Sequence, residues 1–240
     1  ERVYGFPACH DAGASIGAAM YVASQGGDKI KRELKTAQLG PAFSNDEVRE
    51  VLKFSKVSFS ACDDIAERSA KLLSEGKLVG WFQGRMEMGP RALGGRSILA
   101  DPSVSGVSDK LNDEVKMRET WRPFCPSILD KRAADHFAGS EDAAFMTVAL
   151  RVKEGAREGM KEAMHVDGTA RPQVVREAAS PIYHRLLTQF EGQTGRPFLL
   201  NTSFNVSGEP IVCSPAEALR SFYACGLDAL AIGDFLVEKK

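Results

Sequence analysis

The 240-residue sequence lacks the hallmarks of several large protein classes. Its five cysteines include no Cys-x-x-Cys pair, which argues against a disulfide framework and against the common zinc knuckles. No apolar run approaches the roughly 18 residues of a membrane span, and no secretion signal is visible. Lys and Arg (31) nearly balance Asp and Glu (32), so broad nucleic-acid binding through excess positive charge is not expected. These absences favour a cytoplasmic protein without membrane or nucleic-acid partners.

What is present describes an ordinary globular chain. Hydrophobic residues make up 43% and charged residues 26%, which is enough to bury a core. Periodicity and capping residues predict helices over residues 45–54, 63–75, 108–115, 131–137, 180–190 and 214–224. Strands are expected at residues 78–82, 124–129, 146–152, 197–202 and 229–237. Because these elements alternate irregularly, we expect an α/β (α+β) fold with a mixed sheet flanked by helices rather than a doubly wound one.

The sequence divides at about residue 60. Residues 1–27 contain the small-residue stretch DAGASIGAAM, which is typical of a tightly packed helix, but they are too few to build a core of their own. We therefore expect them to be the end of a preceding domain, so that the chain is part of a longer protein. Residues 28–60 are predicted to be a linker, and residues 61–240 a compact domain.

Four polar motifs carry the chemistry. Glycine lets backbone amides approach an anion, and an arginine fork matches phosphate or carboxylate oxygens. Polar residues at strand ends are where α/β folds place ligand groups. In chain order the motifs are GPRALGGRS (89–97), LNDEVKMRETWRPF (111–124), HVDGTARPQ (165–173) and NTSFNVSGEPIV (201–212).

Each motif also has a structural explanation. The first could be a glycine-rich turn with solvated arginines, and the last could consist of turn hydrogen bonds. Arg118 could be one of the cations that favour a helix C-terminus as readily as a functional group. His10 is interpreted as structural, because adjacent His and Asp side chains seldom chelate one ion. His184 lies in a helical pattern that indicates packing or surface.

Together the four motifs, in this order, resemble the carbamoyltransferase family that modifies nodulation factors and antibiotics such as tobramycin and cephamycins. The resemblance extends over essentially the whole chain. It implies a YrdC-like domain from about residue 61 and, in residues 1–27, the end of a Kae1-like domain. In that family the YrdC-like domain binds carbamoyl phosphate and, with ATP and Mg²⁺, makes carbamoyl-adenylate. The Kae1-like domain then moves the carbamoyl group to a hydroxyl of a sugar-containing acceptor.

The resemblance also assigns residues. Arg91, Lys116, Arg122 and Arg171 are implied to bind the phosphate and carbamoyl oxygens as catalytic residues. Asn201 and Ser203 are implied to complete the pocket, and Arg96 and His165 are placed with them as substrate-binding residues. Asp11 resembles a metal-binding aspartate whose histidine partners lie upstream, so Fe or another divalent metal is expected only with the missing N-terminal domain.

Two other functions compete with the enzyme reading. A YrdC-like fold could be a module that binds RNA or another polyanion, but the Lys-Arg-Pro motif of tRNA-modifying relatives is missing and the net charge is −1. A hydrogenase-maturation relative would need zinc-finger Cys-x-x-Cys pairs, which the sequence lacks.

Overall fold

The computed structural model describes residues 5–30, 34–139 and 143–239. The helices of these residues are η1 (Asp11–Gly13), α1 (Ala14–Gln25), α2 (Asn45–Phe54), α3 (Ile65–Ser74), α4 (Val107–Lys110), the π-helical turn η2 (Leu111–Lys116), α5 (Asp130–His136), η3 (Glu154–Ala156), η4 (Glu158–Ala163), α6 (Pro181–Thr194) and α7 (Pro215–Tyr223). The strands are β1 (Ser60–Ala61), β2 (Val79–Phe82), β3 (Arg96–Ala100), β4 (Cys125–Leu129), β5 (Leu150–Arg151), β6 (Thr169–Ala170), β7 (Gln173–Val175), β8 (Phe198–Ser203), β9 (Ala229–Ile232) and β10 (Phe235–Glu238).

One mixed sheet organises the domain. Its eight strands lie in the order β1-β10-β9-β2-β3-β8-β4-β7. β2 runs parallel to β9 and β4 runs parallel to β7, whereas the other neighbouring strands are antiparallel. β5 and β6 form a separate two-stranded sheet. The predicted mixed α/β class is confirmed.

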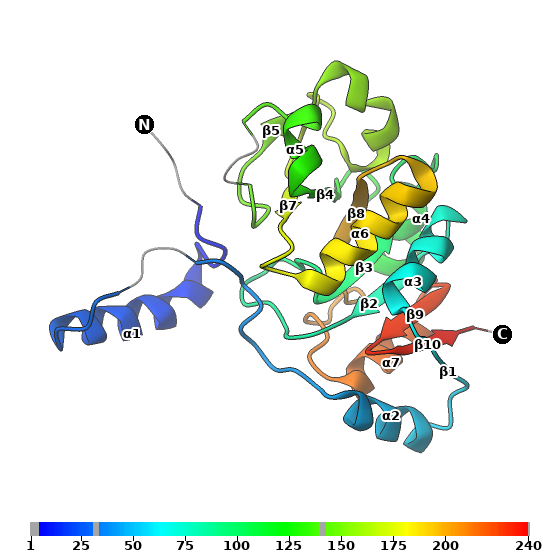
Figure 1. The fold of residues 1–240 in the computed structure, drawn as a ribbon, viewed down its shortest axis with the longest axis horizontal. Helices are drawn as coiled ribbons and strands as arrows, with labels where there is room; N and C mark the ends of the chain where they lie inside the picture. Colours follow the sequence, from blue (N-terminus) through cyan, green and yellow to red (C-terminus); the bar gives the residue numbers. More distant parts are fainter. Residues whose placement is uncertain (1–4, 31–33, 140–142, 240) are drawn as a thin grey trace.

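Both faces of this sheet are buried because alternate side chains of its central strands enter different cores. On β2, Val79 and Trp81 join the core beneath α3 and α6. Phe82 on the same strand points the other way, into the core that contains Val48 of α2 and Phe222 of α7. Figure 1 shows α3 and α6 lying side by side over the sheet, with α7 and α2 at its lower end.

Local sequence signals place the helix ends. Ser44 and Ser214 each form a capping box with the glutamate three residues later, so α2 and α7 begin as predicted. Gly195 takes the left-handed conformation that ends α6. The helices expected at 45–54, 63–75, 131–137, 180–190 and 214–224 are thus confirmed to within a few residues.

Three expectations need correction, and some strands were not predicted. The strand expected at 229–237 is a hairpin, because Gly233 adopts φ +54° and turns β9 into β10. The strand expected at 146–152 is wrong apart from the two residues of β5, and the helix expected at 108–115 divides into α4 and the π-helical turn η2. β3 and β7 were not predicted, because each follows directly on a glycine-rich or arginine-containing loop that hides its short apolar run.

The segment before residue 60 is of two kinds. α2 gives Val48 and Leu52 to the main core, whereas α1 has no buried residue and projects from the body in Figure 1. The division at residues 27 and 60 stays a prediction. Within the described ranges, no helix is long and apolar enough to cross a membrane.

Candidate functional site

The four motifs meet at one pocket of about 100 Å³. Arg91, from the loop between β2 and β3, and Arg171, just before β7, both line it. Asn201 and Ser203, at the end of β8, lie between them in the middle of the sheet order. The pocket thus unites four residues that lie up to 112 positions apart in the sequence (203 − 91). It also contains Arg118, which the sequence left undecided.

Arg91 is the least restrained of the three pocket arginines. It is half-buried and makes no hydrogen bond or ion pair to any residue that the structure describes. Burial lowers the pKa of its guanidinium, and the nearby charge of Arg171 lowers it further. An arginine in such surroundings favours a bound anion, which would offset both effects.

The other two arginines are held in place by neighbours. Arg171 donates from Nη2 to the Sγ of Cys125 on β4 at 3.2 Å. Arg118 donates from Nε to Oδ1 of the buried Asn112 at 2.7 Å, and its guanidinium lies 4.7 Å from the centre of the Phe124 ring. Each of these contacts leaves further N–H groups of the guanidinium for a ligand.

The chemistry of the pocket is that of an anion site. Three guanidinium groups border it, and no carboxylate is among its lining residues in the described part of the chain. Its other polar groups are neutral hydroxyl, thiol and amide groups. Arginine forks of this kind bind phosphate and carboxylate oxygens in pairs of parallel hydrogen bonds.

A buried polar network holds the floor of the pocket. Asn201 donates from Nδ2 to the carbonyl of Ala92 (3.3 Å), to Ser127 Oγ (2.9 Å) and to Gln173 Oε1 (3.1 Å). Gln173 in turn donates to the carbonyl of Leu93 at 2.8 Å. These bonds tie the Arg91 loop to β4, β7 and β8, so the loop is fixed from within the sheet.

Lys116 lies directly behind Ser203. Its Nζ contacts four oxygens: the carbonyl and Oγ of Ser203, and the carbonyl and Oδ1 of Asn205. Burial, with a smaller contribution from Arg118, lowers the pKa of Lys116 from 10.5 to about 7. Lys116 therefore adjoins the pocket through the end of β8 and is not itself a lining residue.

Arg96 has a different position from the one expected of a substrate-binding residue. It is fully buried, and its guanidinium donates to the carbonyls of Gln83, Gly84, Gly95 and Pro41 at 3.1–3.2 Å. It also stacks 3.6 Å from the centre of the Phe82 ring. These contacts give Arg96 a structural role, because it fastens the glycine-rich loop to β2.

The remaining predicted residues lie outside the pocket lining. Arg122 is exposed and pairs with Glu119 at 3.9 Å. His165 contacts Thr169 Oγ1 at 2.9 Å within its own turn, and His184 lies on α6 at 3.7 Å from Asp130. Asp11 is exposed in η1.

No metal site is formed by the residues that the structure describes. Among them, no three His, Cys, Asp or Glu side chains gather closely enough to hold an ion. A single exposed carboxylate such as Asp11 does not fit a metal by itself. A metal role for Asp11 stays a prediction that depends on ligands from outside this chain.

Glycine is required where the loop approaches α6. Gly94 has φ +94°, and a Cβ there would lie 2.2 Å from Cδ1 of the buried Tyr183. We expect Gly94→Ala to lower the free energy of unfolding by about 2 kcal/mol, through overpacking and backbone strain. Urea denaturation measures this effect. Gly192→Ala, on an open stretch of α6, is the control and should stabilise slightly; equal effects of the two variants would contradict the packing described.

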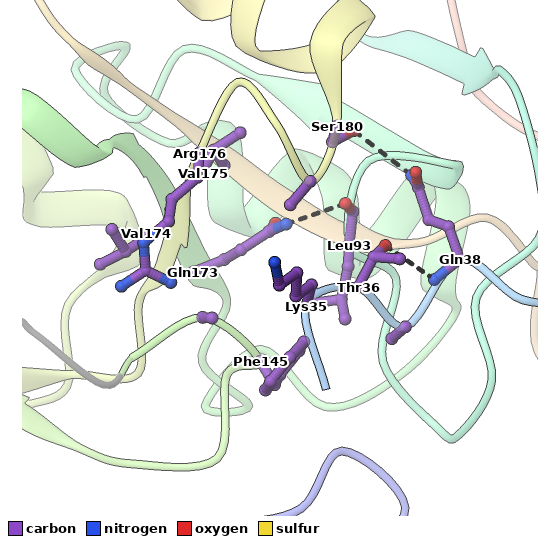
Figure 2. A pocket seen from close by; sticks show the side chains of 13 residues that line it. Lys35, Thr36, Gln38, Leu93, Phe145, Gln173, Val174, Val175, Arg176 and Ser180 are labelled. Carbon is purple, nitrogen blue, oxygen red and sulfur yellow. Dashed lines mark hydrogen bonds between the residues drawn. The ribbon is translucent and has the colours of Figure 1, made fainter. Parts of the chain in front are cut away.

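A second cavity of about 30 Å³ borders the same loop from another side. Figure 2 shows Gln173 reaching the carbonyl of Leu93 across it, and Gln38 reaching Ser180 at the start of α6. The segment that contains Lys35 and Thr36 closes this cavity. The cavity holds little more than a water molecule, so it belongs to the packing around the loop.

The fold and the pocket define an α/β domain with an arginine-lined pocket at the centre of a mixed sheet. The family model described as "Carbamoyltransferase C-terminus" matches residues 70–239, and the chain therefore belongs to the carbamoyltransferase family. It is 42% identical to nodulation protein NolO of Bradyrhizobium diazoefficiens over 247 aligned residues, covering 100% of this chain and 45% of NolO. It is 38% identical to the 3'-hydroxymethylcephem-O-carbamoyltransferase of Amycolatopsis lactamdurans over 162 residues, 68% of this chain and 31% of that enzyme.

These comparisons also bear on length and fold. The chain spans less than half the length of the two relatives. Among solved structures it is similar to P. abyssi Sua5 complexed with L-threonine, with a TM-score of 0.50 and 17% identity over 72% of this chain and 47% of that one. At this identity the likeness concerns the fold alone, and it confirms the expected YrdC-like architecture.

Proposed function

We propose that this chain is the carbamoyl-phosphate-binding part of an ATP-dependent O-carbamoyltransferase. The observation that carries the proposal is the convergence of Arg91, Arg118 and Arg171 on one pocket without a carboxylate in its lining. Membership of the carbamoyltransferase family supports a carbamoyl donor as this anion. The acceptor would be a hydroxyl of a sugar-containing molecule, such as a nodulation factor or an antibiotic precursor.

The proposed chemistry needs positioned cations rather than a nucleophilic side chain. Carbamoyl phosphate first yields phosphate and carbamate by cleavage with water. A carbamate oxygen then attacks the α-phosphorus of ATP, so that a new P–O bond forms and the bond to pyrophosphate breaks, giving carbamoyl-adenylate. The first step produces two anions in one pocket and the second brings carbamate against the phosphates of ATP, and preorganised guanidinium groups stabilise these charges. Mg²⁺ would enter with the nucleotide and neutralise part of its charge.

Residue roles follow from position. Arg91 of the first motif and Arg171 of the third would bind the phosphate and carbamoyl oxygens. Arg118 of the second motif would add a third guanidinium group. Ser203 would present its hydroxyl at the pocket edge, with the charge of Lys116 behind it. Asn201 of β8 would hold the Arg91 loop in place through its hydrogen bond to the carbonyl of Ala92.

Calorimetric titration with carbamoyl phosphate tests the proposal, with inorganic phosphate and a short RNA as comparison ligands. We expect carbamoyl phosphate to bind more tightly than phosphate, and carbamoyl-phosphate-dependent release of pyrophosphate from ATP to follow when the full-length protein is used. Binding of RNA with a steep salt dependence, and none of carbamoyl phosphate, would instead identify a polyanion module.

Two arginines of the second motif, Arg118 and Arg122, are expected to contribute differently to ligand binding. Arg118 lines the pocket, whereas Arg122 is exposed beside Glu119. We expect Arg118→Ala to weaken carbamoyl-phosphate binding about tenfold, the effect of one lost charge-assisted hydrogen bond, and Arg122→Ala to have a smaller effect. Titration of both variants decides the order. The reverse order would mean that residues 118–123 rearrange when the ligand binds.

A further inference from the structure

The carboxylate of Glu87 is the centre of the loop that carries Arg91. Glu87 is almost fully buried, with 5% of its surface exposed. Its Oε1 accepts hydrogen bonds from the backbone N–H groups of Leu93 and Gly95, each at 2.6 Å. Its Oε2 accepts one from Arg96 N at 3.1 Å. The Glu87 side chain therefore accepts hydrogen bonds from three backbone amides at the C-terminal end of the loop.

This arrangement depends on the local sequence. A Cβ at Gly95 would lie 2.7 Å from the carbonyl oxygen of Arg85 and 3.0 Å from Oε2 of Glu87. With glycine there, the backbone comes close enough for the carboxylate to receive its amides. Burial raises the pKa of Glu87, while the hydrogen bonds from the loop amides lower it. Toward these amides both carboxyl oxygens act as acceptors, of two bonds at 2.6 Å and one at 3.1 Å.

Arg91 stands at the tip of the segment that this carboxylate closes. It lies midway between Glu87 and Gly95, and it has no partner of its own among the described residues. On one side Met88 N donates to the carbonyl of Ala37 at 2.8 Å. On the other side the carbonyl of Ala92 accepts from Asn201. The backbone position from which the Arg91 side chain extends is thus set by its loop, which Glu87 holds together with these contacts.

We infer that Glu87 is a positioning residue of the anion pocket, acting on the ligand only through Arg91. This inference rests on the function proposed above. The carboxylate does not line the pocket and cannot contact the ligand. It fixes the backbone from which Arg91 reaches the phosphate or carbamoyl oxygens, so that this part of the loop is in place before the ligand arrives.

A double-mutant cycle tests the inference. Glu87→Gln keeps one carbonyl oxygen for Leu93 and Gly95 but puts an amide N–H opposite the N–H of Arg96. We expect this variant to raise the Kd for carbamoyl phosphate about tenfold, and to raise it less than about twofold when Arg91 is already alanine, because the coupling runs through that residue. Equal losses in the two backgrounds would overturn the inference, as would an unchanged Kd in Glu87→Gln.

The matched control is Glu162, a partly buried carboxylate that likewise accepts hydrogen bonds from backbone amides, those of Gly106 (3.2 Å) and Ser108 (3.3 Å). It holds the turn before α4, which carries no pocket arginine. Glu162→Gln should lower stability to a similar extent and leave the Kd unchanged; a matching rise in Kd would show that any loss of stability weakens binding, against the inference.

A further measurement separates this inference from the proposed function. If the wild-type chain binds no carbamoyl phosphate, the proposed function fails, but hydrogen exchange still reports on the loop. Exchange at the amides of Leu93, Gly95 and Arg96 should accelerate in Glu87→Gln while the amides of β8 stay protected. Unchanged exchange at the three loop amides would refute the role of Glu87 whatever the ligand is.

Discussion

Replacing Arg91 with alanine is expected to weaken the binding of carbamoyl phosphate by about 1.5 to 3 kcal/mol, which is roughly 10- to 150-fold. The reason is that Arg91 is a half-buried guanidinium that makes no hydrogen bond to the described residues and faces the pocket. Its removal takes away a fork for the ligand and leaves the fold untouched. Calorimetric titration of the variant measures the loss.

Arg68→Ala is the appropriate control for this experiment. Arg68 is a partly exposed arginine of α3 that pairs with Glu238 of β10 at 3.5 Å. Its removal changes the net charge by the same amount without touching the pocket, so the affinity should stay within about twofold, as expected for an exposed ion pair. Similar losses in both variants would mean that general positive charge, and not the pocket, attracts the ligand.

Between about pH 7.5 and 9 the affinity for carbamoyl phosphate is expected to fall, on the order of 20-fold if only the protonated form of Lys116 supports binding. Burial lowers the pKa of Lys116 to about 7, so the ammonium charge behind Ser203 is lost over this range. The phosphate group itself has already lost its second proton near pH 6 and contributes no change. Titrations at several pH values measure the slope.

The stability of the protein should change in the opposite direction. In the unfolded chain Lys116 keeps a pKa near 10.5, so between pH 7 and that value the unfolded state binds more protons than the folded one. The free energy of unfolding attributable to this group therefore rises with pH. Lys116→Met removes the ammonium group, so both trends should flatten in that variant. A pH slope of binding that persists in Lys116→Met would assign the titration to another group.

Much of the fold was predictable because the deciding signals are local. Ser44 and Ser214 begin their helices through capping boxes, and Gly195 ends α6. The hairpin at Gly233 was missed, because the apolar residues on both sides of one glycine read as a single strand. β3 was also missed, because its first residue, Arg96, is charged and resembles the polar loop that precedes it.

The sequence predicted the kind of residues at the site, but only some of the residues that line the pocket. Motif resemblance identified Arg91, Arg171, Asn201 and Ser203, which line one pocket. Residue type could not distinguish Arg96 from Arg118. The guanidinium of Arg96 hydrogen-bonds backbone carbonyls, whereas that of Arg118 borders the pocket. The signal that could have distinguished them is position: Arg96 begins a buried strand, where a charged side chain must satisfy its hydrogen bonds within the protein.

The sequence by itself determined the positions of most helices, the mixed α/β class and the arginine- and glycine-rich character of the site, because capping, periodicity and composition act over a few neighbouring residues. Only the tertiary structure decided which arginines face one another. That choice depends on the strand order, which places the end of β8 between β3 and β4 and so brings the loops of distant strands to one pocket. It depends equally on a buried carboxylate, Glu87, whose hydrogen bonds to Leu93, Gly95 and Arg96 exist only once the loop has closed around it.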